Sequence, residues 1–225
     1  MAGEYEKYGL GVSLREWFEQ NREAVPRYIE RYFRGVGVNP EPYGGRHFEA
    51  FIELSDPDRF GPMDFLAIQA LEVSIPSGAA LQVLRAAVDK YNDLLMGLPR
   101  APIWEAERAV FEPGGAAIKL FNLLDDLPDV GITKATKLMA AKRPHLIPIQ
   151  DAFVQEELVL PKGRFWLPMY DQLSDEPLRQ FIGDLTKGAP DGVSLLRCID
   201  VAVWMHVNDR KKADRLQQRQ MAAEG

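Results

Sequence analysis

The sequence predicts an all-α protein with a helical, bundle-like core. Apolar residues recur at helical spacing along almost the whole chain of 225 residues, and no segment predicts a sheet. Helix start signals agree with this pattern: Ser13-Leu-Arg-Glu16 has the spacing of a capping box, and Pro26 stands where a first helical turn would begin. The composition, 46% hydrophobic and 27% charged, is that of an ordinary globular chain and argues against global disorder.

The expected helices follow one another along the chain, and proline or glycine separates most of them. Pro76 ends the buried apolar run 64–73, Pro99 follows the amphipathic run 77–98, and Pro113 with two glycines divides the next two runs. The segment 47–54 fits either a short strand or a short helix, and both interpretations stay open. The expected helices are one that starts after Ser13 and those over 26–34, 64–73, 77–98, 103–111, 116–124, 133–141, 152–158, 175–185 and 193 to about 221.

A loop-like segment divides the chain unequally. Residues 35–47 contain four Gly and two Pro, a composition that is typical of a loop or linker. We therefore predict an N-terminal helical arm over 1–44 and a helical core domain over 45–225. The core domain contains two helices joined by a tight turn at about 116–142.

Charge and cysteine usage exclude several classes of protein. The chain has 27 Lys+Arg against 33 Asp+Glu, a net charge of −6, which does not suit a general nucleic-acid coat protein that must neutralise phosphates. The lone Cys198 excludes an internal disulfide framework, a cysteine-ligated zinc site and a four-cysteine iron–sulfur cluster. The three histidines lack metal-ligand spacing, so we expect no metal site. Because no stretch has the pattern of a secretory signal or a membrane span, we expect a cytoplasmic protein without membrane contact.

One segment of this acidic chain is basic. Between Val130 and Gln150 there are four cations and no acid, so the rest of the chain carries a net charge of −10. The turn 128–131 precedes the helix 133–141, whose first N–H groups and positive dipole end form a ready anion site. Such localised charge is typical of a phosphate contact. A solvated helix surface is the alternative for the same cations: Lys134, Lys137, Lys142 and Arg143.

The same segment contains a recognisable motif. The pattern Leu-Pro-x-Val-Gly-x-x-x-Ala-x-x-Leu runs from Leu127 to Leu138, and Asp151 stands 24 positions after Leu127, behind an apolar stretch with proline. Over about 122–155 the chain thus resembles the helix-hairpin-helix DNA glycosylase superfamily. The resemblance implies a glycosylase-like helical fold, with Asp151 facing a cleft as the catalytic carboxylate, and a monovalent cation on the hairpin carbonyls as the only cofactor. The phosphate-binding residues that it implies are Val130, Gly131, Thr133, Lys134, Lys137, Lys142 and Arg143.

The chain departs from the superfamily pattern at two positions. Asp129 stands where the superfamily has a glycine close to the phosphate. Thr133 stands where the bifunctional members carry the lysine that forms a Schiff base, and Lys134 is one residue away, roughly 100° round the helix. The resemblance therefore implies a monofunctional enzyme rather than a lyase. The single cysteine also excludes the cluster-bearing members of the superfamily.

A second resemblance covers more of the chain. Three stretches, which begin at Phe60-Gly-Pro-Met, Lys142-Arg-Pro-His and Val193-Ser-Leu-Leu, are similar to an uncharacterised bacterial family of unknown function. The similarity spans roughly 45–207. It implies one structural unit and supplies no activity.

Several candidate residues keep two interpretations. Asp151 suits catalysis, but it also suits the N-cap of the helix 152–158. Arg197 and Asp200 are three residues apart on a mostly apolar helix, where they form either a structural ion pair or a site in which Asp200 reaches the same cleft as Asp151. The tail 210–219 has five cations and one acid, which form either a basic stripe for DNA or a solvated helix end.

Two hypotheses for function follow. The first is a DNA-binding protein with a glycosylase-like fold that acts as a monofunctional base-excising N-glycosidase on a flipped base. The second is a non-catalytic binding or scaffold protein that retains the fold. A cleft that reaches Asp151 favours the first, whereas a buried Asp151 that only caps a helix favours the second. The sequence leaves open whether the protein is an enzyme, which base it would act on, and its oligomeric state.

Overall fold

A computed structural model describes residues 13–34, 43–158 and 165–224 of the chain. Within these ranges the backbone forms α-helices, a few 3₁₀ and π turns and connecting loops, with no strand. The prediction of an all-α fold is therefore confirmed. Most of the loop predicted over 35–47 lies outside the described residues.

The chain starts with two short helices, α2 (Leu14–Gln20) and α3 (Val25–Arg34). The capping box of α2 is formed as the sequence predicts: the Glu16 N–H donates to Ser13 Oγ at 3.1 Å, and the Ser13 N–H donates to the Glu16 carboxylate at 3.3 Å. Both helices bury aromatic and aliphatic side chains, Trp17 and Phe18 in α2 and Ile29 in α3. This burial fixes both helices against the rest of the protein.

The middle of the chain contains six α-helices and several short turns. The segment left open as strand or helix is helical, a 3₁₀ turn Gly44–His47 followed by α4. The predicted helix 77–98 is interrupted, because a π-helical turn, Gln82–Ala86, ends at Ala87, whose φ of −133° is not helical. The helices in order are α4 (Phe48–Glu53), α5 (Pro62–Ala70), α6 (Ser77–Leu81), α7 (Val88–Met96), α8 (Ala116–Asp125) and α9 (Gly131–Lys142).

The predicted helix 103–111 is wrong. The chain forms two separate 3₁₀ turns there, Ile103–Glu105 and Arg108–Phe111. The Ile103 N–H donates to the carbonyl of His145 at 2.9 Å, so a long-range hydrogen bond takes the place of a local helical one.

Four helices complete the chain: α10 (Ala152–Leu158), α11 (Trp166–Leu173), α12 (Glu176–Thr186) and α13 (Leu195–Glu224). Three of them lie close to their predicted positions. The sequence did not predict α11, because Pro168 interrupts its apolar pattern. Pro168 is the third residue of the helix, and proline is tolerated in a first helical turn, where its missing N–H costs no hydrogen bond.

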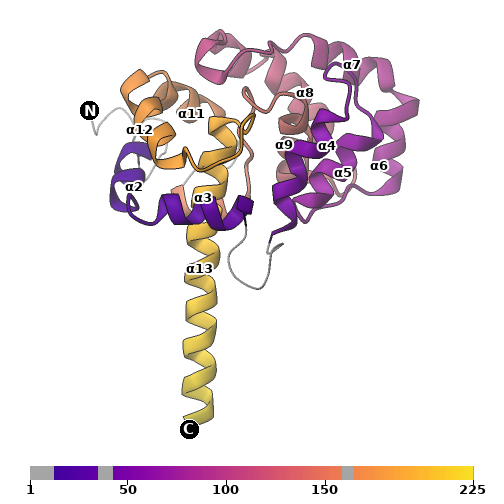
Figure 1. The fold of residues 1–225 in the computed structure, drawn as a ribbon. Helices are drawn as coiled ribbons and strands as arrows, with labels where there is room; N and C mark the ends of the chain where they lie inside the picture. The colour runs from indigo at the N-terminus through magenta and orange to yellow at the C-terminus, as the bar shows by residue number, and fades with distance from the viewer. Residues whose placement is uncertain (1–12, 35–42, 159–164, 225) are drawn as a thin grey trace.

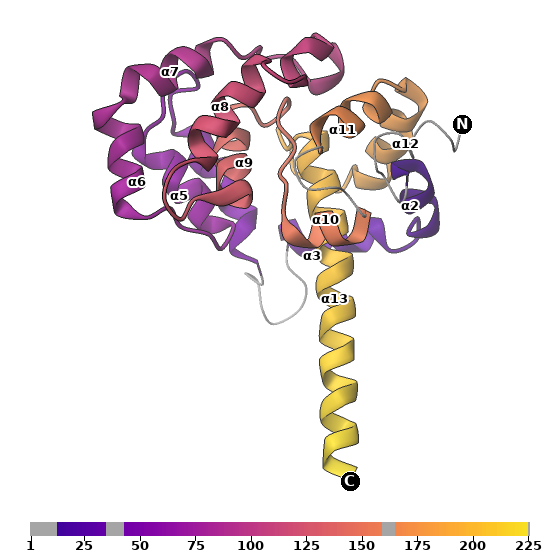
Figure 2. The ribbon, with the colours of Figure 1, turned by 180° about the vertical axis from the view of Figure 1, so that it is seen from behind.

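The helices form two groups (Figures 1 and 2). We call α4 to α9 the central group, in which α5 packs against α4 and α9, and α9 packs against α8. We call α2, α3 and α10 to α13 the terminal group, because it combines both ends of the chain: α3 packs against α12 and α13, and α10 packs against α13. The segment 143–151 leads from the central group into the terminal group.

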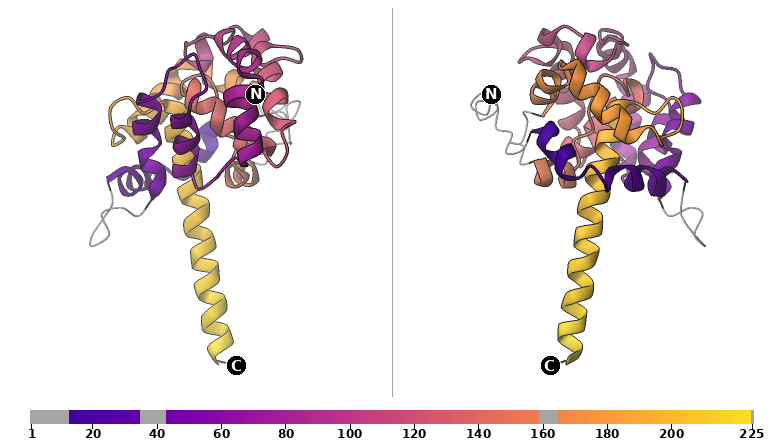
Figure 3. Two further views of the ribbon diagram at one scale, coloured as in Figure 1. Left: turned by 90° about the vertical axis from the view of Figure 1, so that its right-hand side faces the viewer. Right: turned by 60° about the vertical axis from the view of Figure 1, so that its left-hand side comes forward.

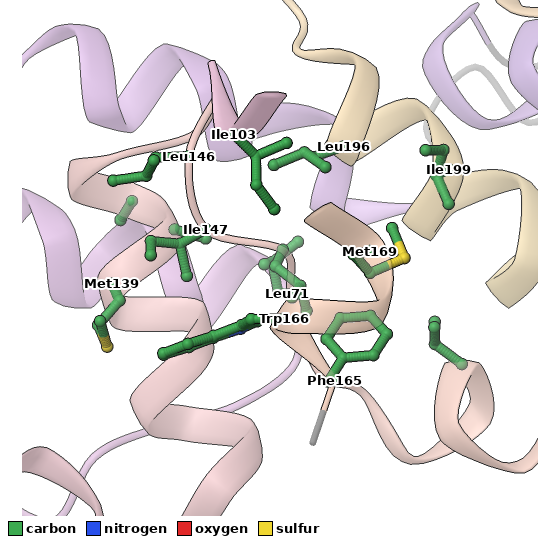
Figure 4. Close-up of a cluster of buried hydrophobic side chains, with 14 of the residues drawn as sticks. Leu71, Ile103, Met139, Leu146, Ile147, Phe165, Trp166, Met169, Leu196 and Ile199 are labelled. Carbon is green, nitrogen blue, oxygen red and sulfur yellow. The ribbon is translucent and has the colours of Figure 1, made fainter. Parts of the chain in front are cut away.

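A shared hydrophobic core joins the two groups (Figure 4). In the close-up, Trp166 of α11 lies among aliphatic side chains from both groups, and its indole N–H donates to the Pro148 carbonyl at 3.2 Å. Burial of this apolar surface holds the groups together. The labelled side chains are Leu71, Ile103, Met139, Leu146, Ile147, Phe165, Trp166, Met169, Leu196 and Ile199.

A buried ion pair anchors the end of α9. Lys142 Nζ lies 2.5 Å from the Asp64 carboxylate, and neither side chain is exposed. The same ammonium donates to Ser55 Oγ at 2.6 Å and to the Asp56 carbonyl at 2.8 Å. Burial raises the pKa of Asp64 and lowers the pKa of Lys142, so each charge depends on the other for its stability in the interior.

Removal of the Lys142 ammonium should be strongly destabilising. We expect Lys142→Met to lower the free energy of unfolding at pH 7 by about 3–5 kcal/mol, because it leaves Asp64 buried without a counter-ion. The pKa of Asp64 in the folded protein lies above its unfolded value, so the deficit should shrink as the pH falls and Asp64 binds a proton. Urea unfolding at several pH values measures this change. The exposed Lys90→Met is the control, and an equal loss in both variants would contradict the role of the pair.

Candidate functional site

The turn between α8 and α9 has an unusual backbone conformation. Asp129 has a φ of 59° and Gly131 a φ of 65°, so both are left-handed. An aspartate tolerates this conformation better than most side chains, which explains how Asp129 occupies a position where glycine is expected. Gly131 starts α9 and is exposed, and no atom lies within 4 Å of where its Cβ would be. Gly131 therefore occupies an open position at the start of α9.

Only one of the four predicted phosphate-binding cations lies near this turn. The partly exposed Lys134 has its Nζ 2.6 Å from the Asp129 carbonyl oxygen. This ammonium already occupies one of the carbonyls to which the superfamily resemblance assigns a monovalent cation. The cation itself stays a prediction.

The other three cations point into the protein, which differs from the sequence-based expectation of a basic surface. Lys137, Lys142 and Arg143 are 6%, 3% and 3% exposed. Arg143 donates to the carbonyls of Leu95 and Pro57 at 2.9 and 2.5 Å, so it holds loops of the central group in place. Sequence periodicity did not reveal this burial because α9 is covered on nearly all sides, and long side chains extend along apolar surfaces to distant polar partners.

Asp151 lies at the boundary of the two groups and has two different partners. One carboxylate oxygen, Oδ1, accepts the N–H of Phe153 at 3.0 Å and thereby caps α10. The other, Oδ2, lies 3.1 Å from Lys137 Nζ. Lys137 also donates to the Leu71 carbonyl at 3.1 Å. The two interpretations of Asp151 are therefore compatible, because one oxygen serves as the cap while the other is available to a site.

Two threonines of α9 hold the chain in front of Asp151. The Thr133 hydroxyl donates to the Gln150 carbonyl at 3.3 Å, and the Gln150 N–H donates to Thr136 Oγ1 at 3.1 Å. The backbone before Asp151 is thus tied to the same helix that carries Lys137. The Thr133 hydroxyl thus helps to hold the backbone before Asp151, and its predicted phosphate contact stays a prediction.

A cavity of about 440 Å³ lies between the two groups and is lined by Asp151. This volume is in the range of small-molecule sites. Its walls combine charged groups of both signs with four aromatic residues, one of which is Tyr32. The lining residues that bear on function are Lys137 and Asp151, Arg197 and Asp200 of α13, and Tyr43, Phe153 and Trp204.

Arg197 forms the centre of a charged cluster at this cavity. Its guanidinium donates to the Tyr32 hydroxyl at 2.6 Å and to the Gly45 carbonyl at 3.0 Å, and it is hydrogen-bonded to Asp200. The Glu49 carboxylate lies 3.4 Å from its Nε. Arg197 and Asp200 therefore form the structural ion pair that the sequence allowed. Asp200 also lines the cavity that contains Asp151.

The pKa values of two carboxylates in this cluster, Asp200 and Glu49, are raised. Burial raises the pKa of Asp200, the Arg197 charge opposes this shift, and the Asp151 charge adds to it. Burial likewise raises the pKa of Glu49. Asp151 and Asp200 therefore lie in the same cavity close enough for the Asp151 charge to act on the pKa of Asp200.

Sequence reasoning did not single out several cavity residues, among them Tyr43, Phe153 and Asn208. Asp200, Trp204 and Asn208 are spaced by four along α13, so they share one face, and this spacing was the available signal. The Asn208 amide nitrogen is buried and has no hydrogen-bond partner among the described residues. It therefore offers an unused donor beside the cavity.

The described residues form neither a metal-binding group nor a membrane-spanning helix. No three His, Cys, Asp or Glu side chains of the described residues gather into a metal-binding group. In the same residues, no helix is both long and apolar enough to cross a membrane.

The sequence matches the model of one protein family. The model of a family of unknown function, DUF6308, matches residues 25–207. The chain belongs to this family. The match starts at the first residue of α3, so the family covers part of the predicted N-terminal arm, the central group, the cavity residues up to Trp204 and α13 up to Val207. The predicted resemblance to an uncharacterised family is thereby confirmed. No curated protein and no solved structure matches the chain.

The geometry of Arg197 predicts that lysine cannot replace it. Lysine has three donors at one nitrogen and cannot reach Tyr32, Gly45 and Asp200 together, so we expect Arg197→Lys to lower the free energy of unfolding by about 3 kcal/mol. Urea unfolding with an unchanged m value measures the loss. The exposed Arg85→Lys should be neutral. Equal stability of Arg197→Lys and the wild type would show that the cluster is not structural.

Proposed function

We propose that the protein binds DNA and accepts a single extruded nucleobase in the cavity between its two helix groups, as a monofunctional N-glycosidase. The observation that carries the proposal is the position of Asp151, which lines a cavity of about 440 Å³ and pairs with Lys137 of α9 through Oδ2. The resemblance of residues 122–155 to the helix-hairpin-helix glycosylases supports the same class of substrate. A base must leave the stack before its glycosidic bond is accessible, and a cavity of this kind suits it.

The composition of the cavity agrees with a nucleobase ligand. Tyr43, Phe153 and Trp204 provide aromatic walls on which a planar base can stack. The Asn208 amide offers a donor for a base edge. An apolar metabolite would not need these polar groups, and a highly charged one would not need the aromatic walls.

In the proposed reaction the C1′–N bond breaks, a water oxygen bonds to C1′, and the departing base takes the proton that the water loses. Positive charge develops on the sugar in the transition state, and the Asp151 carboxylate stabilises it electrostatically. Lys137 holds this carboxylate in place. Two of its three ammonium donors are used by Asp151 and the Leu71 carbonyl, which leaves one for a ligand. Asp200 adds a second carboxylate to the same cavity.

DNA would meet the protein at the turn between α8 and α9. The first N–H groups of a helix suit a phosphate oxygen, and the exposed Gly131 at the start of α9 leaves room for one. Lys134 supplies positive charge nearby. We therefore keep the backbone of Val130 and Gly131 together with Lys134 as the phosphate contact and leave out the three buried cations.

A specific observation also supports a non-catalytic binding protein. The Asp151 carboxylate is neutralised by Lys137 and caps α10, so it has a structural role even without a ligand. In that case the cavity would bind a base without cleaving its bond. Measurement of base release separates the two functions.

Asp151→Asn should stop base release and leave the fold intact. Asparagine caps a helix as well as aspartate does, so the fold should persist, but Lys137 loses its counter-ion and we expect the free energy of unfolding to fall. Loss of the negative charge should slow base release by roughly 100-fold or more. Base release from a panel of duplexes with damaged or mismatched bases is the measurement. If the wild type releases no base from any of them, the enzymatic proposal is wrong.

Lys134→Glu should abolish DNA binding at the turn. It replaces the one predicted cation that lies near the start of α9 with a charge that repels phosphate. Affinity for a labelled duplex, measured at several salt concentrations, should fall sharply, and wild-type binding should weaken steeply with salt. Lys90→Glu makes the same charge change in α7 and should bind like the wild type. Unchanged binding by Lys134→Glu would rule out the turn as a phosphate contact.

A further inference from the structure

The last part of α13 projects beyond the other helices, after Arg210 and Lys211 pair with Glu157 and Glu156 of α10 at 2.7 and 2.8 Å. Figures 1 and 3 show α13 leaving the other helices and continuing as a single helix. Every side chain from Lys212 to Ala222 is exposed. We call residues 210–222 the α13 arm. It is about 20 Å long at the rise of an α-helix.

The α13 arm is basic and poor in apolar side chains. It carries five cations and one acid, Asp214. Leu216 and Met221 are its large apolar residues, 60% and 68% exposed, and they form no continuous apolar stripe. Arg215 and Arg219 have no ion-pair partner among the described residues, and their like charges are four residues apart, which destabilises an isolated helix. An anionic ligand would remove this repulsion.

The arm continues the face of α13 that lines the cavity. Asp200, Trp204 and Asn208 line the cavity at intervals of four residues, and Lys212 follows Asn208 at the same interval. Arg215 is itself a lining residue, which places it at the cavity mouth.

Lysines of the arm cover the aromatic side chains at the cavity. Lys211 Nζ lies 4.0 Å from the centre of the Phe153 ring, and Lys212 Nζ lies 5.7 Å from that of Tyr43. A ligand bound along the arm would thus contact the aromatic walls with its next group. Phosphates spaced along a strand, with bases between them, have this alternation of charge and aromatic surface.

We propose that the α13 arm docks on duplex DNA and guides the strand to the cavity mouth. The inference rests on the proposed function in that DNA is the ligand, but it assigns the contact to a second element, far in sequence from the turn before α9. The helix is narrow enough for a major groove. Arginine and glutamine, the side chains that read guanine and adenine edges, make up much of the arm: Arg215, Gln217, Gln218, Arg219 and Gln220.

Other occupants suit the arm less well. A second copy of the chain would bring one basic stripe against another, because a two-fold contact joins like surfaces. A protein groove requires apolar anchors at intervals of three and four residues, and a membrane surface requires a broad apolar face. The arm has neither pattern.

The test compares two double variants of the full chain. Arg215→Gln with Arg219→Gln removes two arm charges and keeps good helix formers. Arg85→Gln with Lys90→Gln removes the same charge from exposed positions of the central group and is the matched control. Fluorescence anisotropy with a labelled 20-base-pair duplex gives the affinity between 50 and 200 mM salt. Hydrogen exchange of the wild type, with and without the duplex, locates the contact.

We expect the arm variant to bind roughly tenfold or more weakly, and its slope of log affinity against log salt to fall by about 2, because two phosphate contacts are lost. The control should bind within about twofold of the wild type, since distant exposed charges are screened. The amides of residues 212–222 should become protected when the duplex is added.

The inference is overturned if the arm variant binds like the wild type, if the control loses as much affinity, or if the arm amides stay unprotected. Preferential binding to phosphatidylserine vesicles, dimerisation through the arm, or a wild type that does not bind DNA at 50 mM salt would overturn it as well. Base release is scored separately. If binding depends on the arm but no base is released, the glycosidase proposal is wrong and the DNA contact of the arm stands. If base is released but affinity does not depend on the arm, the arm contact is wrong and the glycosidase proposal stands.

Discussion

The need to neutralise buried cations on and just after α9 shapes the structure around them. Lys137, Lys142 and Arg143 are almost fully buried, and an unpaired charge in the interior is very costly. Lys142 therefore binds Asp64 and the loop before it, Arg143 binds the carbonyls of two loops, and Lys137 binds the Leu71 carbonyl and Asp151. The central group is ordered around these contacts. Through Lys137 the same constraint extends to the cavity and links the two helix groups.

Asp151 shows how one carboxylate serves structure and site together. Its Oδ1 satisfies a backbone N–H at the start of α10, and its Oδ2 faces Lys137 at the cavity. A catalytic side chain must be held rigidly, and a helix cap holds it without occupying both oxygens. The threonine contacts to Gln150 fix the backbone that precedes it. Structural support is therefore what makes the proposed chemistry feasible.

The distribution of charge is also clearer in three dimensions. Most cations of the basic segment 130–150 are buried and paired with internal groups, so they add little positive charge to the surface. On α13, Lys212, Arg215 and Arg219 are exposed and follow one another closely, with Arg215 at the cavity. An acidic protein can thus present one narrow basic surface to a polyanion while the rest of its surface repels it.

The sequence by itself determined the helical class, the capping box at Ser13, the positions of α8, α9, α10 and α12 and the long last helix, because these depend on local periodicity and end signals. It also singled out Asp151 and the pair Arg197 and Asp200. It could not decide whether Lys137 and Lys142 face water or the core, since both outcomes have the same sequence pattern. Only the tertiary structure brought Asp151, Asp200 and Lys137 to one cavity, because their proximity depends on long-range packing of α9 against α5 and of α10 against α13.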